Sequence, residues 1–235
     1  MVNAGKIIVP SGLVPIHSFD MYGPIVDSWI LGEEQVQLFQ EAARREKFEP
    51  DSIEKIISDY RALNRGESWA TGLKKPEIID ALKKPIDRHS DLQPNYQAAL
   101  YADALDTIKD IVGAGERILI FSTRKQKWIN DYLLPFVGEM EIPQYEGNKA
   151  KPETFQTAYE QELALGRRIV THTADELPEL EAAIASGIFS EKQGKTIFVN
   201  RNNTVSNEQA KVAGIDFCVR SPKEVPYSRL VSRAG

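Results

Sequence analysis

The segment Arg117-Ile118-Leu119-Ile120-Phe121-Ser122 is an apolar run of strand length that ends in a hydroxyl residue. Further apolar runs of similar length occupy residues 168–172, 196–199 and 217–219. Continuous apolar runs are typical of strands that are covered on both faces. Stretches with apolar residues at helical spacing separate these runs and end at glycine. This alternation predicts an α/β fold with a doubly wound, Rossmann-like parallel sheet.

Residues 28–98 differ from this pattern because they show helical periods and no convincing strand. Apolar residues recur at helical spacing over 53–63, and Pro76 stands in the first turn of another predicted helix, where its missing N–H costs nothing. The sequence therefore predicts two domains. Residues 1–27 and 99–235 would form an α/β core, and residues 28–98 a small all-helical insertion after the first core strand.

Length and composition indicate a globular chain with a hydrophobic core. The 235 residues are 42% hydrophobic and 27% charged, which suits one domain with a modest insertion and excludes disorder. The 29 basic and 34 acidic side chains give a net charge of −5, and no long basic stretch is present. This balance disfavours a nucleic-acid partner. No apolar run approaches the ~18 residues of a membrane span, so we expect no membrane partner.

The single cysteine, Cys218, excludes an internal disulfide framework and fits a reducing cytoplasm. It lies in an apolar run, which predicts a buried thiol on a strand rather than a nucleophile. The apolar patch at residues 7–14 is broken by proline and glycine and lacks a small-residue cleavage site. We therefore expect no signal peptide and a cytoplasmic location.

The first core strand ends at Asp20, where the chain reads Phe19-Asp20-Met21-Tyr22-Gly23-Pro24. An aspartate at this place lies at the carboxyl end of the sheet, where open α/β folds bind their ligands. The same side chain could instead cap the Gly-Pro turn through its own backbone. The residues alone leave both interpretations open.

Four segments in order along the chain resemble the motifs of the haloacid dehalogenase superfamily. Residues 19–28, Phe-Asp-Met-Tyr-Gly-Pro-Ile-Val-Asp-Ser, are similar to the first motif, a hydrophobic strand with a nucleophilic aspartate and a Gly-Thr-type turn. Ser122 resembles the second motif, a serine or threonine that ends another hydrophobic strand. Lys149, followed by Pro152 and Phe155, keeps the spacing of the third motif, and Lys151 is the alternative lysine.

The fourth segment runs from residue 173 to 187 and resembles the acidic motif that precedes an alanine-rich helix closing on glycine. It contains Asp175 and Glu179, four residues apart. The predicted insertion at 28–98 falls between the first two motifs, where many members of the family carry a small cap. The resemblance thus implies a haloacid dehalogenase core with a helical cap.

The resemblance also implies an Mg²⁺-dependent mechanism in which the aspartate attacks the substrate and forms a covalent intermediate. The implied catalytic residues are Asp20, Tyr22, Ser122 and Lys149. The implied substrate-binding residues are Ser122, Thr123 and Lys149. The implied Mg²⁺ ligands are Asp20, Tyr22 through its backbone carbonyl, Asp175 and Glu179. Oxygen ligands of this kind suit Mg²⁺.

Tyr22 departs from the phosphatase pattern, which has a second aspartate two residues after the nucleophile as general acid and base. A tyrosine here resembles the dehalogenase branch, whose first motif often reads Asp-x-Tyr-Gly-Thr, and Pro24 replaces the usual threonine. Two enzymatic alternatives are therefore a 2-haloacid dehalogenase and a phosphonate hydrolase that cleaves a carbon–phosphorus bond. A non-enzymatic alternative is a catalytically weak binding or regulatory protein that retains the fold.

Among these alternatives we expect a cytoplasmic, Mg²⁺-dependent phosphatase that acts on a small phosphorylated metabolite. The pair Asp175 and Glu179 opposes a dehalogenase, because a departing halide needs no divalent cation and extra carboxylates would repel a carboxylate substrate. A cap that closes over the site would exclude macromolecular substrates. His172, which precedes the acidic segment, is expected to be a hydrogen-bonded core histidine.

Overall fold

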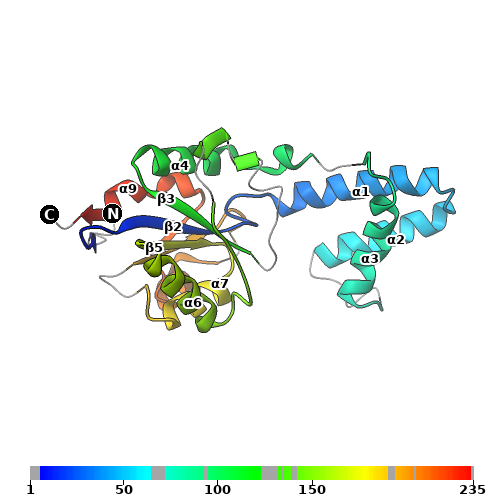
Figure 1. Ribbon diagram of the computed structural model, residues 1–235. Helices are drawn as coiled ribbons and strands as arrows, with labels where there is room; N and C mark the ends of the chain where they lie inside the picture. The colour runs from blue at the N-terminus through cyan, green and yellow to red at the C-terminus, as the bar shows by residue number, and fades with distance from the viewer. Residues whose placement is uncertain are drawn as a thin grey trace. The chain divides into compact units, whose positions relative to one another are not determined.

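The computed structural model describes residues 6–64, 72–92, 95–122, 132–133, 135–138, 142–189, 194–203 and 205–233. The chain forms two compact units, one made of residues Met1–Val26 with Leu100–Gly235 and the other of Asp27–Ala99. These divisions fall within one residue of the ends of the insertion that the sequence predicts at 28–98. The first unit contains the sheet and the second contains α1, α2 and α3 (Figure 1).

The first unit is built on a six-stranded parallel sheet with the order β4-β3-β2-β5-β6-β7. Its strands are β2 (Val14–Asp20), β3 (Arg117–Ser122), β4 (Gln144–Glu146), β5 (Arg167–Ala174), β6 (Lys195–Val199) and β7 (Phe217–Val219). In chain order this is the doubly wound arrangement 3-2-1-4-5-6, which reverses direction between β2 and β5. The predicted doubly wound parallel sheet is therefore confirmed.

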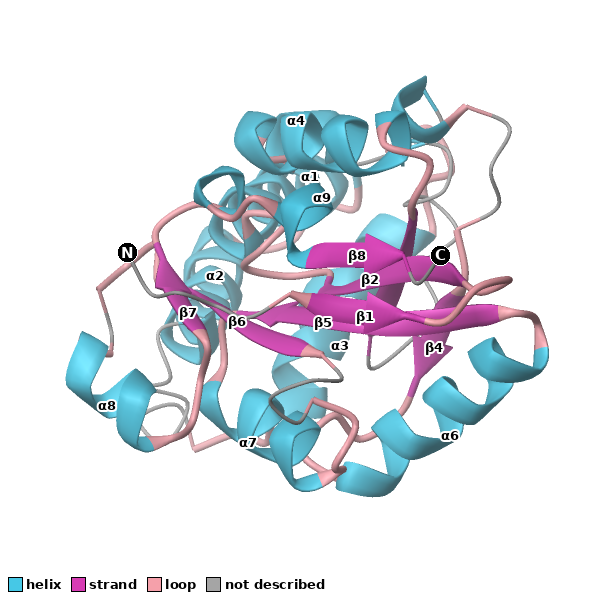
Figure 2. Ribbon diagram, turned by 90° about the vertical axis from the view of Figure 1, so that its left-hand side faces the viewer, coloured by secondary structure: helices cyan, strands magenta, loops and turns pink. Residues whose placement is uncertain are grey.

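Helices cover both faces of this sheet (Figure 2). One face carries α4 (Ala102–Gly113) and α9 (Tyr227–Leu230), with the 3-10 helix η3 (Pro222–Glu224) packed against α4. The other face carries α6 (Pro152–Ala164) and α7 (Leu177–Ala185), and α8 (Asn207–Val212) packs near β7. Because both faces are covered, the central strands are buried along almost their whole length.

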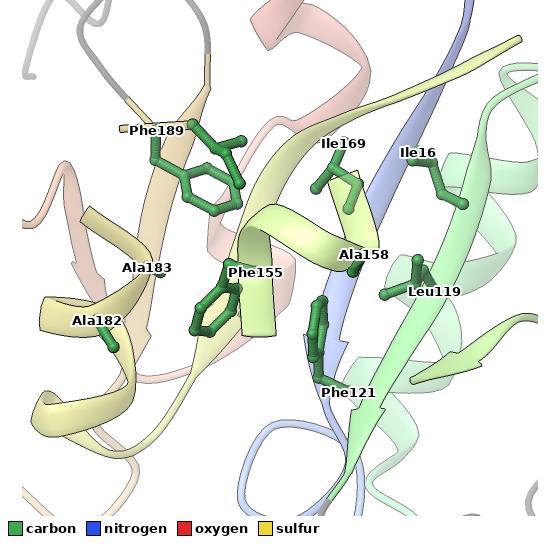
Figure 3. Close-up of a cluster of buried hydrophobic side chains, with 10 residues drawn as sticks. Ile16, Leu119, Phe121, Phe155, Ala158, Ile169, Ala182, Ala183 and Phe189 are labelled. Carbon is green, nitrogen blue, oxygen red and sulfur yellow. The ribbon is translucent and has the colours of Figure 1, made fainter. Parts of the chain in front are cut away.

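The hydrophobic core beneath α6 and α7 supports the central strands from one side. Phe155 and Ala158 of α6 lie against Phe121 and Leu119 of β3, and Ala183 contributes from α7 (Figure 3). The rings of Phe121 and Phe155 stand 4.9 Å apart between their centroids. This packing thus fixes the position of β3 relative to α6.

The sequence did not predict three short strands. β1 (Ile7–Val9) and β8 (Val231–Arg233) pair in parallel as a separate two-stranded sheet, and β4 has only three residues. Strands this short carry too few residues for a hydrophobic period to be recognised. Cys218 on β7 is half-buried rather than fully buried, because β7 is the edge strand of the sheet.

The second unit consists, in its described residues, of helices and connecting turns. They are α1 (Ser28–Arg45), α2 (Pro50–Asn64), α3 (Lys75–Asp87) and the 3-10 helix η2 (Tyr96–Ala99). Phe39, Ile57 and Leu82 form part of a core of its own. The Asp27 carboxylate caps α1 by accepting hydrogen bonds from the amides of Trp29 and Ile30. No helix among the described residues is long and apolar enough to cross a bilayer.

Candidate active site

The predicted nucleophile lies where the strand order reverses. Asp20 is the last residue of β2, and the register pairs it with Phe121 of β3, so Ser122 follows directly at the same edge of the sheet. On the other side Phe19 pairs with Thr173 of β5, which places Asp175 just beyond the end of that strand. The parallel topology therefore brings the first, second and fourth motif segments to one edge.

The side chain of Lys149 joins the first, third and fourth motif segments. Its Nζ lies 2.6 Å from Oδ2 of Asp20 and 2.7 Å from Oε2 of Glu179. Both carboxyl side chains are at most 4% exposed, and Lys149 is 12% exposed. The structure thus favours Lys149 over Lys151, because Lys151 is exposed at the start of α6.

A tight turn positions Lys149 ahead of α6. The Asn148 side chain accepts a hydrogen bond from the amide of Ala150, and the Asn148 carbonyl accepts one from the Thr154 hydroxyl. Pro152 begins α6, where its missing N–H breaks no helical hydrogen bond. Phe155 then packs into the core below. The spacing from Lys149 to Phe155 therefore comes from a hydrogen-bonded turn followed by the first turns of α6, on which Phe155 is buried.

Three acidic groups in this site carry strongly shifted pKa values. Burial, with a contribution from Glu179, raises the pKa of Asp20 to about 7 against the opposing effect of Lys149. Burial and the charge of Asp20 raise the pKa of Asp175 to about 7. Burial likewise raises the pKa of Glu179 to about 7, although Lys149 acts to lower it. Asp20 and Glu179 thus share one ammonium group in a desolvated site, and Asp175 lies within the field of Asp20.

Asp175 approaches the turn after β2 very closely. Gly23 adopts φ +81°, and a Cβ atom at this position would lie 2.0 Å from Cγ of Asp175. Glycine is therefore favoured at this turn for two reasons, the left-handed backbone and the space that the Asp175 carboxyl group occupies.

His172 lies directly beneath the acidic groups and is fully buried. Its Nε2 lies 3.0 Å from Oε1 of Glu179, and its Nδ1 lies 2.9 Å from the Ser18 hydroxyl oxygen. Burial lowers the pKa of His172 to about 3, so the ring is neutral. The Ser18 hydroxyl also donates to the carbonyl oxygen of Thr171 at 2.7 Å. His172 therefore connects Ser18 of β2 to Glu179 through its two ring nitrogens.

The remaining predicted residues occupy the same edge of the sheet or lie outside the described residues. Ser122 is buried at the end of β3, and Tyr22 is half-buried in the turn after Asp20. Thr123 lies outside the described residues. His172 is the hydrogen-bonded core histidine that the sequence predicts, but its contact with Glu179 was not foreseen. Its position three residues before Asp175 on a strand was the available signal.

The acidic groups do not surround a common point. Within the described ranges, no three His, Cys, Asp or Glu side chains meet closely enough to hold a metal ion. Both oxygens of Glu179 already contact protein groups, one the ammonium of Lys149 and the other the ring of His172. Both oxygens of Asp20 likewise contact protein groups, the amide of Met21 and the ammonium of Lys149.

The fold is shared with solved structures of low sequence identity. A HAD phosphatase from Thermococcus onnurineus matches with a TM-score of 0.54 and 16% identity, over 89% of this chain and 95% of that chain. A predicted phosphatase from Clostridium acetobutylicum matches with a TM-score of 0.51 and 15% identity, over 90% and 96%. A hydrolase from Pseudomonas syringae matches with a TM-score of 0.50 and 13% identity, over 92% and 99%. Searches with the sequence found no matching family model and no matching curated protein.

These likenesses, together with the doubly wound sheet, show that the chain has the fold of the haloacid dehalogenase hydrolases. The resemblance that the sequence motifs suggested is thus confirmed at the level of the fold.

Gly23→Ala should destabilise the protein more than Gly12→Ala does. Gly12 also has a left-handed backbone, with φ +85°, but no atom lies within 4 Å of the place that a Cβ atom would take there. Both variants carry the left-handed strain of ~1–2 kcal/mol, and Gly23→Ala should cost a further ~1–3 kcal/mol for overpacking against Asp175. Urea unfolding measures both. In an Asp175→Ala background the extra cost should disappear, and equal costs in the wild-type background would contradict the close approach.

The metal-free protein should lose stability as the pH rises from ~5 to ~8. The pKa values of Asp20, Asp175 and Glu179 are about 7 in the folded state, against about 4 in an unfolded chain. Between these pKa values the folded state binds more protons than the unfolded state, so the free energy of unfolding falls as the pH rises through this interval.

Asp20→Asn should flatten this slope and raise the melting temperature at pH 8 by ~3 °C or more, since ~1 kcal/mol corresponds to about 2–4 °C for a chain of this size. Asp80→Asn is the control, because Asp80 is exposed on α3 and pairs with Lys84 at the surface. Thermal unfolding of each variant with chelator present, at several pH values, supplies the data. A wild-type stability that rises with pH over this window would refute the electrostatic description.

Proposed function

We propose that the protein is a hydrolase that uses Asp20 as a nucleophile on the phosphoryl group of a phosphate ester. The observation that carries this proposal is the contact of Lys149 with both Asp20 and Glu179 at the switch point of the sheet. A buried ammonium beside a buried carboxylate can attract an anionic group and hold it against that carboxylate. The haloacid dehalogenase fold, which the chain shares with a protein named as a phosphatase, agrees with this chemistry.

Asp20 is oriented by the backbone amide of Met21 and by Lys149. Its Oδ1 accepts a hydrogen bond of 2.7 Å from the amide of Met21, and its Oδ2 faces the Lys149 ammonium. In the proposed reaction a carboxylate oxygen of Asp20 attacks phosphorus and the ester oxygen leaves with its electron pair. Water then cleaves the aspartyl-phosphate and returns the free carboxylate and inorganic phosphate. Lys149 would hold the phosphoryl oxygens during both steps, and Ser122 would donate a hydrogen bond to them.

A magnesium ion fits the donor chemistry of this site. The charge of Asp20 raises the pKa of Asp175, and the single ammonium of Lys149 does not balance the acidic groups. Hard oxygen donors with uncompensated negative charge suit Mg²⁺. We propose that Asp20, Asp175 and the backbone carbonyl of Tyr22 bind the Mg²⁺ ion. Glu179 would position Lys149 through its contact with the ammonium group. The ion would neutralise charge on the transferring phosphoryl group.

Tyr22 keeps the second enzymatic candidate open. A tyrosine in place of the usual acid favours a substrate whose leaving group needs no proton, such as halide or an activated phosphate ester. A 2-haloacid dehalogenase would use the same Asp20 on carbon and require no metal, and a phosphonate hydrolase would also lack the second acid. Retention of the fold as a binding module is the non-enzymatic candidate.

The charge, the helical insertion and the single cysteine bear on the substrate class and the cellular location. The net charge of −5 and the helical insertion between the first two motif segments support a small metabolite rather than a nucleic acid. The single half-buried cysteine suits a reducing compartment. We therefore propose a cytoplasmic enzyme with a small phosphorylated substrate.

Asp20→Asn should reduce turnover of any accepted phosphate ester by ~10³-fold or more, because the amide keeps the shape and loses the nucleophilic charge. Lys149→Ala should cost ~10²-fold or more through lost charge stabilisation. Lys151→Ala is the matched control, since this exposed lysine should be replaceable with little effect. The measurement is steady-state hydrolysis of aryl and alkyl phosphates and 2-haloacids, with Mg²⁺ and with chelator.

Each rival has its own signature in this panel. Haloacid turnover that ignores chelator would replace the phosphatase with a dehalogenase. Binding of phosphate esters without turnover at any Mg²⁺ concentration would favour a binding module. Near-wild-type activity of Asp20→Asn would remove the nucleophile assignment altogether.

A further inference from the structure

Arg201, in the turn after β6, connects three segments of the α/β unit. Its Nε donates to the carbonyl of Gly23 at 3.1 Å and its NH2 group to the carbonyl of Pro24 at 3.1 Å. The NH1 and NH2 groups bind the two carboxylate oxygens of Asp103, at 2.9 and 3.0 Å. The guanidinium carbon also stacks 3.7 Å from the centre of the Tyr101 ring. The first two contacts lie on the turn that follows the predicted nucleophile.

That turn is held by a closed set of backbone contacts. The amide of Val26 donates to the carbonyl of Met21, and the amide of Gly23 donates to the carbonyl of Val26, both at 2.9 Å. The carbonyl of Ile25 accepts from the amide of Tyr101 at 3.0 Å. Arg201 therefore adds side-chain hydrogen bonds to the tip of the turn, at the carbonyl groups of Gly23 and Pro24.

Asp103 holds the guanidinium in place for this task. Partial burial acts to raise the pKa of Asp103, but hydrogen bonds from Arg201 and Ser221 outweigh it and bring the pKa below its usual value. The carboxylate is therefore charged and can bind the guanidinium through two parallel hydrogen bonds. The planar guanidinium matches this geometry while its remaining donors reach two carbonyl groups at once. A lysine ammonium cannot reproduce this arrangement.

We propose that Arg201 is a positioning residue that holds the turn from residue 21 to 26, and with it the surroundings of Asp20, in the conformation needed for reaction. The turn carries Tyr22, and its Gly23 lies against the carboxyl group of Asp175. A displacement of this turn would therefore change the spacing of Asp20, Tyr22 and Asp175. Arg201 binds the carbonyl groups of this turn and affects Asp20 through the position of the turn. The catalytic consequence rests on the proposed function, whereas the effect on the turn does not.

Arg201→Lys and Asp103→Asn test this inference, and Arg220→Lys is the matched control at an exposed arginine after β7. Hydrogen–deuterium exchange is followed on the peptide that contains the amides of Gly23 and Val26. Both test variants should raise exchange in this peptide by ~10-fold or more, because local opening becomes easier, while β3 and β5 keep their protection. The control should leave every peptide unchanged.

With an aryl phosphate that the wild type hydrolyses, Arg201→Lys should lower kcat by ~10-fold or more and change KM by less than ~3-fold, since a misplaced reacting group costs rate rather than uniform binding. Unchanged exchange in the turn, or exchange raised throughout the protein, would overturn the inference. Local opening of the turn with an unchanged kcat would overturn it as well.

A wild type that hydrolyses none of the substrates would count against the proposed function and not against the inference. The exchange experiment then decides alone whether Arg201 holds the turn.

Discussion

The ammonium group of Lys149 is the interaction on which the rest of the site depends. It lies within 2.7 Å of carboxyl oxygens from Asp20 and Glu179, both of which are buried. Buried carboxylates without a cation would be costly, and the raised pKa values of both groups show that one ammonium offsets this cost incompletely. A desolvated site with surplus negative charge and one fixed cation is suited to bind a second cation together with an anionic substrate.

The sheet topology explains why these groups can meet. Asp20 ends β2 and Asp175 follows β5, and these two strands are neighbours because the strand order reverses between them. Lys149 arrives from the turn before α6, which packs on β5. Behind the acidic groups, neutral His172 connects Glu179 to Ser18 of β2. The site is therefore supported by the two central strands rather than by loops alone.

The sequence predicts the parts of this structure that follow from strong periodicity or fixed spacing. The apolar runs at 117–122 and 196–199 could be recognised as buried strands, and the spacing of Lys149, Pro152 and Phe155 marked an anchored turn before a helix. The choice between Lys149 and Lys151 could not be made, because it depends on which side chain points toward Asp20. The contacts of Arg201 were equally invisible, since they join residues about 100 and 180 positions apart in sequence.

In the proposed reaction Asp20 becomes covalently attached to the phosphoryl group during turnover. The direct measurement is rapid acid quenching of the reaction, borohydride reduction of any acyl phosphate, and mass spectrometric mapping of the peptides. The account predicts homoserine in place of Asp20, at a level that follows the amount of enzyme turning over, and none in Asp20→Asn. Sustained turnover with an unmodified Asp20 under the same quench, or homoserine at a different aspartate, would contradict it.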